Sequence, residues 1–373
     1  MQMAKHGMLF LGLCFFFSPL SAQLISIPNP TNPSCMAGRQ VGVTNIEVRW
    51  NAPGVKGREG QIWGSPVAPY GFNVLGFGSN MASPWRAGAD ECTTISFSTD
   101  VLVQGKKLAA GKYALFMALY PDSVILIFNK NHTAWGSYFY DVAQDVLRVT
   151  TSLQKNLTDS QELLDYAFTE QTDRSVVLQL RWERWKIPML IEVDLKTTTL
   201  ASIRAQMSGA MGFDPPSLQA AAQWCLANEV NLDEAHNWIN SASDPNLGGL
   251  QTFPVLSTKA GLLRKMGRAG EADAAMKAAV ASAKVLELHA YGRQLISEKK
   301  YQEALDIFKL NQQKHGDAWP VHVGLMRGYS GVGDLTTALK HAKIALSQAP
   351  DAVNKGSLQN FVKVLESGKA IAQ

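Results

Sequence analysis

The first half of the chain consists of short apolar runs separated by turn residues. The runs are rich in β-branched and aromatic side chains, and they end at pairs such as Gln104-Gly105 and Pro121-Asp122. No long helical period interrupts them, so the pattern predicts an antiparallel β-sandwich or barrel. The expected strands cover residues 41–50, 93–97, 101–103, 112–120, 124–129, 148–154, 163–170, 175–182 and 189–194.

The apolar pattern changes to a helical one after the pair Pro215-Pro216. Four alanines recur there at separations of 37, 32 and 34 residues, in similar contexts: Ala235, Ala272, Ala304 and Ala338. This self-similarity is close to the 34-residue period of tetratricopeptide (TPR) repeats. The sequence therefore predicts a C-terminal α-helical TPR-like solenoid and an α+β multidomain chain.

The N-terminus has the features of a secretory signal. Lys5 precedes an apolar run over residues 8–17, and the small residues Ser21 and Ala22 stand before Gln23. The run is too short for a membrane span. We expect a signal peptide at 1–22, a β domain at 23–213 and a helical repeat domain at 214–373. The product is expected to be periplasmic or secreted, with no transmembrane segment in the mature chain.

Charge and cysteine content narrow the functional classes. A formal net charge of +4 is too small for the electrostatic footprint of a nucleic-acid-binding protein, so no nucleic-acid partner is expected.

Cys35 and Cys92 could pair in an oxidising compartment and leave Cys225 as an odd thiol, or all three could be unpaired. Both alternatives stay open.

Residues 51–90 interrupt the strand pattern with a high density of glycine and proline. A loop of this length is uncommon in a compact domain unless it is functional or flexible. The candidate ligand-binding residues in and around it are Arg49, Arg58, Trp63, Tyr70, Trp85, Arg86, Asp90 and Glu91. They could form a cleft for a sugar or peptide, or the tryptophans could pack the loop while Arg86 pairs with a carboxylate.

The sequence supports no specific catalytic chemistry. His132 is the single histidine of the β domain and is interpreted as a polar turn residue; no GxSxG motif is present. Neither a metal site nor a cofactor is predicted, and the catalytic residues are unknown. A carboxylate pair remains available to a glycan-directed hydrolase, with Glu91 and Asp90 as acid and base and Arg86 orienting the substrate.

A series of motifs lies in order along residues 28–194: RWNAPGVKGR, IWG, PYG, WRAGADECTTISF, LAAGKYALF, IFNK, WGSYFY and DVLRV. With these motifs the segment resembles the DUF2911 family, a domain of unknown function common in exported proteins of Bacteroidetes-like bacteria. The resemblance implies an exported β domain and no established activity. The chain departs from the family pattern in carrying GFNVLGFGSNMASP between Tyr70 and Trp85, where members are typically shorter.

These observations favour a non-enzymatic envelope protein over an enzyme. We expect the β domain to bind a glycan or another envelope ligand, and the TPR-like array to bind a protein or peptide on its concave face. The alternative is the glycan-directed hydrolase with its site in the 51–91 region.

Overall fold

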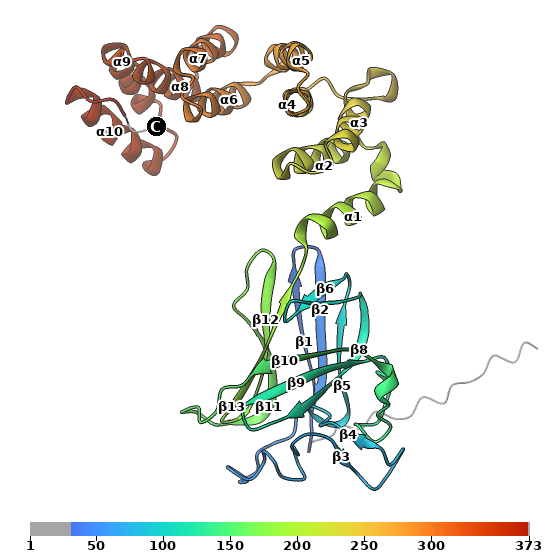
Figure 1. Cartoon of the computed structure of the whole chain (residues 1–373). Coiled ribbons are helices and arrows are strands. Elements are labelled where there is room, and N and C mark those ends of the chain that lie inside the picture. The colour runs from blue at the N-terminus through green and yellow to red at the C-terminus, as the bar shows by residue number, and fades with distance from the viewer. Residues whose placement is uncertain (1–30, 372–373) are drawn as a thin grey trace, which may run out of the picture. The chain divides into compact units, whose positions relative to one another are not determined.

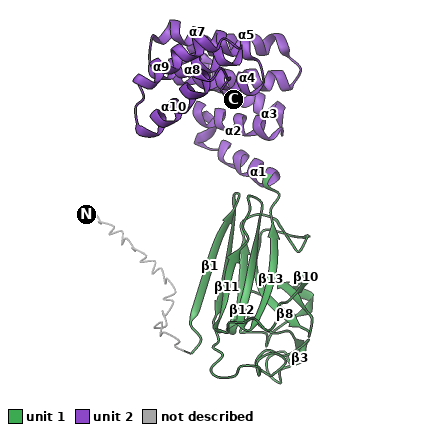
Figure 2. Ribbon diagram, turned by 90° about the vertical axis from the view of Figure 1, so that its left-hand side faces the viewer, with its two compact units in different colours: residues 1–195 green, residues 196–373 purple. Residues whose placement is uncertain are grey.

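The computed structural model describes residues 31–371. It divides the chain into two compact units, Met1–Leu195 and Lys196–Gln373, which are coloured separately in Figure 2. The predicted signal peptide lies outside the described residues. No helix within residues 31–371 has the length and apolar content that a bilayer span requires.

The first unit, here called the β unit, is built from antiparallel strands (Figure 1). One sheet has six strands in the order β1-β2-β5-β8-β9-β10, a second has five in the order β11-β12-β13-β6-β7, and β3 and β4 form a small separate pair. Within the described residues neither large sheet closes into a barrel. The strands are β1 (Ser34–Val41), β2 (Thr44–Asn51), β3 (Asn73–Val74), β4 (Ala82–Ser83), β5 (Ala89–Phe97), β6 (Val101–Val103), β7 (Lys106–Leu108), β8 (Gly111–Leu119), β9 (Ser123–Asn129), β10 (Asp145–Ser152), β11 (Gln161–Thr169), β12 (Ser175–Glu183) and β13 (Trp185–Glu192).

The two large sheets contribute to one apolar core. Val48 and Met117 of the first sheet belong to the same buried cluster as Leu180 and Met189 of the second. Alternate residues of β13 are buried along its whole length, as expected for a strand with one face on a core.

Strand β8 differs because both of its faces are buried. Phe116 and Ala118, on the face directed away from the main core, pack with Ala134 and Tyr140 in a second cluster, and Phe72 contacts the same cluster. The segment between β9 and β10 therefore covers the outer face of β8 and β9. This cover positions the candidate site described below.

The second unit, here called the helical unit, contains most of α1 and all of α2–α10. Helices α2 and α3, α4 and α5, α6 and α7, and α8 and α9 pack as consecutive pairs. The helices are α1 (Leu195–Met207), α2 (Pro215–Asn228), α3 (Leu232–Ser243), α4 (Phe253–Lys265), α5 (Ala269–Ser282), α6 (Val285–Ser297), α7 (Tyr301–His315), α8 (Trp319–Gly331), α9 (Leu335–Ser347) and α10 (Ala352–Glu366); short 3-10 helices cover Val142–Gln144, Ala210–Phe213 and Pro245–Leu247.

The recurring alanines occupy equivalent places in these pairs. Ala235, Ala272, Ala304 and Ala338 are fully buried in α3, α5, α7 and α9, the second helix of each pair. A small side chain at this place allows the two helix axes to approach closely.

Helix α1 precedes the boundary expected at residues 213 and 214. Leu200 and Met207 pack against the buried cluster of α2–α4, and Arg204 forms an ion pair of 2.7 Å with Glu234. These contacts explain why the helical unit begins earlier, after Leu195.

The cysteines within residues 31–371 are free thiols. Cys92 and Cys225 are buried and Cys35 is half-buried. Burial is the main cause that raises the pKa of each thiol, so all three favour the protonated, unreactive form.

Candidate functional site

Two of the candidate tryptophans lie in a cluster of four indole rings. Trp63 stacks on Trp185 with ring centroids 4.3 Å apart, and Trp85 stacks on Trp182 at 6.1 Å. The Trp63 Nε1–H group donates a hydrogen bond of 2.8 Å to the Glu183 carboxylate. Both candidates therefore pack the irregular segment onto the second sheet.

Arg58 and Tyr70 are also engaged locally. The Arg58 guanidinium donates to the backbone carbonyls of Gly54 and Val55 at 2.7 and 3.0 Å. The Tyr70 ring lies over Gly64, where an added Cβ would come within 2.5 Å of the ring. These contacts shape the 51–70 segment itself.

Arg86 joins two segments of the β unit. Its Nη1 donates to the Asp90 backbone carbonyl at 3.0 Å, and its guanidinium lies 5.1 Å from the centroid of the Tyr138 ring. Gly136 packs against the same guanidinium, and a Cβ added at Gly136 would come within 2.7 Å of Arg86 Nη1. Arg86 thus fixes the segment after β9 against the start of β5.

The other three candidates line one open groove of about 860 Å³. Arg49 contributes from β2, and Asp90 and Glu91 contribute from β5. His132 and Trp135, from the segment after β9, also line it. We call this feature the bulge groove.

An irregularity in β5 explains how two consecutive carboxylates reach one groove. Asn51 pairs with Ala89 and Arg49 pairs with Thr94, so four residues of β5 lie opposite the single residue Trp50. Asp90 has a positive φ of 55°, which is uncommon for a residue other than glycine. Such a bulge changes the direction of side chains that would otherwise alternate between the two faces.

Hydrogen bonds from amide side chains orient both carboxylates. Asn32 Nδ2 donates to Asp90 at 3.1 Å, and Asn51 Nδ2 donates to Glu91. Arg49 forms its ion pair with Glu47, at 2.6 Å, along the strand. The groove therefore presents carboxylates, amides and a guanidinium without a direct ion pair between Arg49 and Glu91 among the described contacts.

His132 is the functional candidate that sequence reasoning set aside. Its segment is held against β5 by a backbone hydrogen bond of 3.2 Å from Cys92 to Ala134. The His132 Nδ1 atom is buried and has no hydrogen-bond partner within the described part of the chain. Trp135, a wall of the same groove, is 52% exposed. Trp135 opens the WGSYFY motif, but no sequence signal places it or His132 beside β5, because they approach that strand through tertiary structure.

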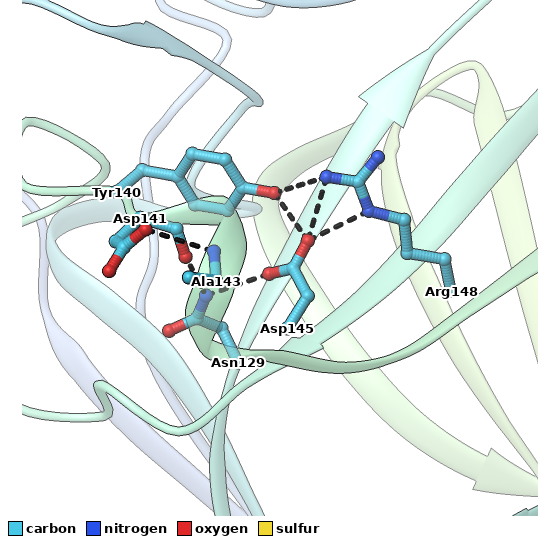
Figure 3. Close-up of polar contacts among 6 residues, drawn as sticks. All are labelled: Asn129, Tyr140, Asp141, Ala143, Asp145 and Arg148. Carbon is cyan, nitrogen blue, oxygen red and sulfur yellow. Dashed lines mark hydrogen bonds and ion pairs between the residues drawn. The ribbon is translucent and has the colours of Figure 1, made fainter.

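A closed polar network anchors the segment that carries them (Figure 3). Tyr140 Oη donates to Asp145 at 2.5 Å, and the Arg148 guanidinium donates to both groups at 2.7 Å. Asn129 Nδ2 donates to the other Asp145 oxygen at 2.7 Å. Burial and then the bond to Asp145 raise the pKa of Tyr140 far above its usual value, so the phenol remains a donor. We interpret this network as structural.

The helical unit has a second groove, of about 690 Å³, lined mainly by α4, α5 and α6. The ring centroids of Phe253 in α4 and Tyr291 in α6 lie 6.0 Å apart. Charged side chains, among them Arg264 and Glu298, share the lining with apolar ones such as Met276. We call it the α4–α6 groove.

The described residues contain no group of three or more histidine, cysteine or acidic side chains arranged to hold a metal ion. Residues 32–191 match the model of a family described as a protein of unknown function, DUF2911. The match covers nearly the whole described part of the β unit. A search of curated proteins finds no relative.

Proposed function

We propose that this chain, in which a DUF2911-matching β unit precedes a helical unit, is a non-enzymatic exported binding protein. The β unit, interpreted as a sandwich, binds a saccharide of the cell envelope in the bulge groove. The helical unit, interpreted as a TPR-like solenoid, binds a peptide or protein segment. Export rests on the signal-like residues 1–22 and gives a periplasmic or secreted protein.

The observation that carries the saccharide proposal is the composition of the bulge groove. The half-exposed indole of Trp135 offers an apolar face on which a sugar ring can stack. Asp90, Glu91, Asn51 and Arg49 surround it with acceptors and donors for hydroxyl groups. A few directed polar groups around one aromatic face are typical of a binding site.

The same carboxylates keep a glycan hydrolase as the second candidate. A glycosidase requires one protonated carboxyl group and one ionised carboxylate on opposite sides of the scissile bond. A general acid at neutral pH is usually a carboxyl group in an apolar, water-poor site, whereas Glu91 is exposed on the groove wall. This environment favours binding over hydrolysis.

The peptide-binding proposal is supported by the repeated helix pairs and by the α4–α6 groove. Its apolar residues Phe253, Tyr291 and Met276 can accept side chains of an extended peptide. The lining also contains Lys277, Glu298 and Arg264, which pairs with Asp273 at 2.8 Å, and these charges can orient a charged segment.

A thermal-shift and hydrolysis assay on residues 23–373 tests the proposal. Soluble peptidoglycan fragments should raise the melting temperature, because a ligand that binds only the native state stabilises it. Trp135→Ala should abolish the shift, while Phe213→Ala, which removes an exposed ring of the helical unit, should leave it unchanged. No new reducing ends should appear.

Two outcomes would replace this account. Reducing ends that appear with the wild type and disappear with Glu91→Gln, while the thermal shift persists, would establish the hydrolase. A shift that survives Trp135→Ala would place the saccharide outside the bulge groove.

A further inference from the structure

The β unit exposes large apolar side chains on the segment that departs from the DUF2911 pattern. Val74, Phe77 and Met81 are 61%, 67% and 63% exposed. Leu75 of the same segment and Phe139 of the segment after β9 are exposed as well. We call these five residues the apolar patch.

The patch is a built surface, since its two segments are joined to each other. Ser79 N donates to the Tyr138 carbonyl at 2.8 Å, and the Phe77 ring meets the Tyr138 ring edge-on at 5.6 Å. Gly78 packs so closely on the Tyr138 carbonyl that a Cβ there would come within 2.3 Å. These contacts hold the Phe77 segment against Tyr138, the residue that precedes Phe139.

The patch lies on irregular chain at one end of the β unit. Figures 1 and 2 both show the β3 and β4 region outside the two large sheets. Strands β3 and β4 are joined by only two residue pairs, Asn73 with Ser83 and Val74 with Ala82. The patch side chains line neither of the two grooves described above. Apolar side chains on such projecting chain suit a deformable partner better than a rigid protein segment.

The charge of the two segments favours an anionic surface. Residues 70–89 and 123–140 contain no aspartate or glutamate, and they include the exposed Lys130. Aromatic residues with polar edges, here Tyr70 and Tyr138, are the type enriched at the interface between bilayer and water. Because the two segments carry no carboxylate, they do not repel anionic lipid headgroups.

We propose that the apolar patch is a membrane-docking surface that inserts Leu75, Phe77 and Met81 into the interfacial region of a lipid bilayer. The contact is peripheral, since apolar side chains enter the headgroup boundary while the fold remains in water. It is independent of the saccharide proposal, because the bulge groove and the patch use different side chains.

Vesicle co-sedimentation tests this proposal with residues 23–373, which contain all described residues and lack the apolar N-terminal run. The probe is vesicles of phosphatidylethanolamine and phosphatidylglycerol. The triple variant Leu75→Ser, Phe77→Ser and Met81→Ser should bind these vesicles with an affinity reduced by a factor of about ten or more. The matched control Phe213→Ser, Leu247→Ser and Val353→Ser, at exposed positions of the helical unit, should bind like the wild type. Circular dichroism verifies that each variant is folded.

Four results would overturn the proposal. The wild type could fail to bind vesicles, or the patch variant could bind as well as the control. Binding lost entirely in about 1 M salt would show an electrostatic contact without apolar insertion. A dimer in sedimentation velocity that the patch variant dissociates would identify a second copy of the chain as the occupant.

Discussion

The Glu183 carboxylate is one of the groups that hold the irregular segment of the β unit in place. It is buried at the end of β12, and its two carboxylate oxygens accept from Gly60 N at 2.6 Å and Trp63 Nε1 at 2.8 Å. The irregular segment depends on this carboxylate to satisfy two donors, one of which belongs to the tryptophan cluster. A single side chain thus connects residues more than a hundred positions apart.

Replacing Glu183 should therefore destabilise the β unit. Glu183→Ala leaves two donors without an acceptor and should lower the free energy of unfolding by about 2–4 kcal/mol. Glu183→Gln keeps one acceptor oxygen and should cost less. Urea unfolding followed by tryptophan fluorescence measures both. Equal stability of Glu183→Ala and the wild type would show that water satisfies the two donors.

Residue chemistry alone could not separate the packing roles from the ligand-facing roles in the candidate set. Trp63 and Trp85 occur in a segment rich in glycine, where an aromatic ring can serve either purpose. The deciding partners, Trp182 and Trp185, lie on distant strands. His132 and Trp135 were not predicted for the same reason, since they approach β5 through a contact between Cys92 and Ala134.

At the scale of elements, Phe308 of α7 determines how α6 and α8 approach. Its ring lies against Gly292 of α6 and against Gly324 and Gly328 of α8, all closer than an added Cβ would allow. Phe308 is fully buried. The glycines are required by this packing, even though glycine lowers helix propensity.

Gly324→Ala should therefore destabilise the helical unit although alanine favours helix. The new Cβ would lie 2.4 Å from Phe308 Cδ1, and overpacking of this kind costs about 1–3 kcal/mol. The matched control is Gly356→Ala in α10, where an added Cβ meets nothing within 4 Å and should stabilise by up to about 1 kcal/mol. Thermal unfolding by circular dichroism compares them. Stabilisation by Gly324→Ala would contradict the packing shown here.

The sequence pattern predicted most of the longer elements but missed β1, the short strands β3, β4 and β7, and α1. The alanine spacing predicted the second helices of the pairs because burial at a close helix crossing restricts side-chain size. Strand β1 was missed because its sequence, SCMAGRQV, is poor in β-branched residues and it lies at an edge with little burial. Helix α1 was missed because its sequence, LKTTTLASIRAQM, has a weak apolar period.

On the scale of the whole molecule, the helical unit concentrates most of the chain's histidines in partly apolar surroundings. Burial is the main cause that lowers the pKa of His236, His289, His322 and His341. His322 and His341 lie with their Nδ1 atoms 2.9 Å apart, so one of these atoms must be unprotonated to accept the hydrogen bond. Asp317, 3.5 Å from His322 Nε2, partly opposes the effect.

Acid should therefore weaken the helical unit. Because the folded-state pKa values lie below the ordinary one, the unfolded chain binds more protons as the pH falls below about 6.5. Histidine-linked stability is complete above that pH and decreases below it. The melting temperature, followed by far-ultraviolet circular dichroism, should fall over this range. Its decrease per pH unit should be smaller in the double variant that carries His322→Asn and His341→Asn. A melting temperature that rises on acidification would contradict the assignment.

The central claim is that the bulge groove binds a saccharide. Calorimetric titration of residues 23–373 with a soluble disaccharide-peptide of peptidoglycan tests it most directly. We predict saturable heat with one site per chain, no detectable heat with Trp135→Ala, and an unchanged isotherm with Phe213→Ala. Absence of heat with the wild type, or the same isotherm with Trp135→Ala, would contradict the claim.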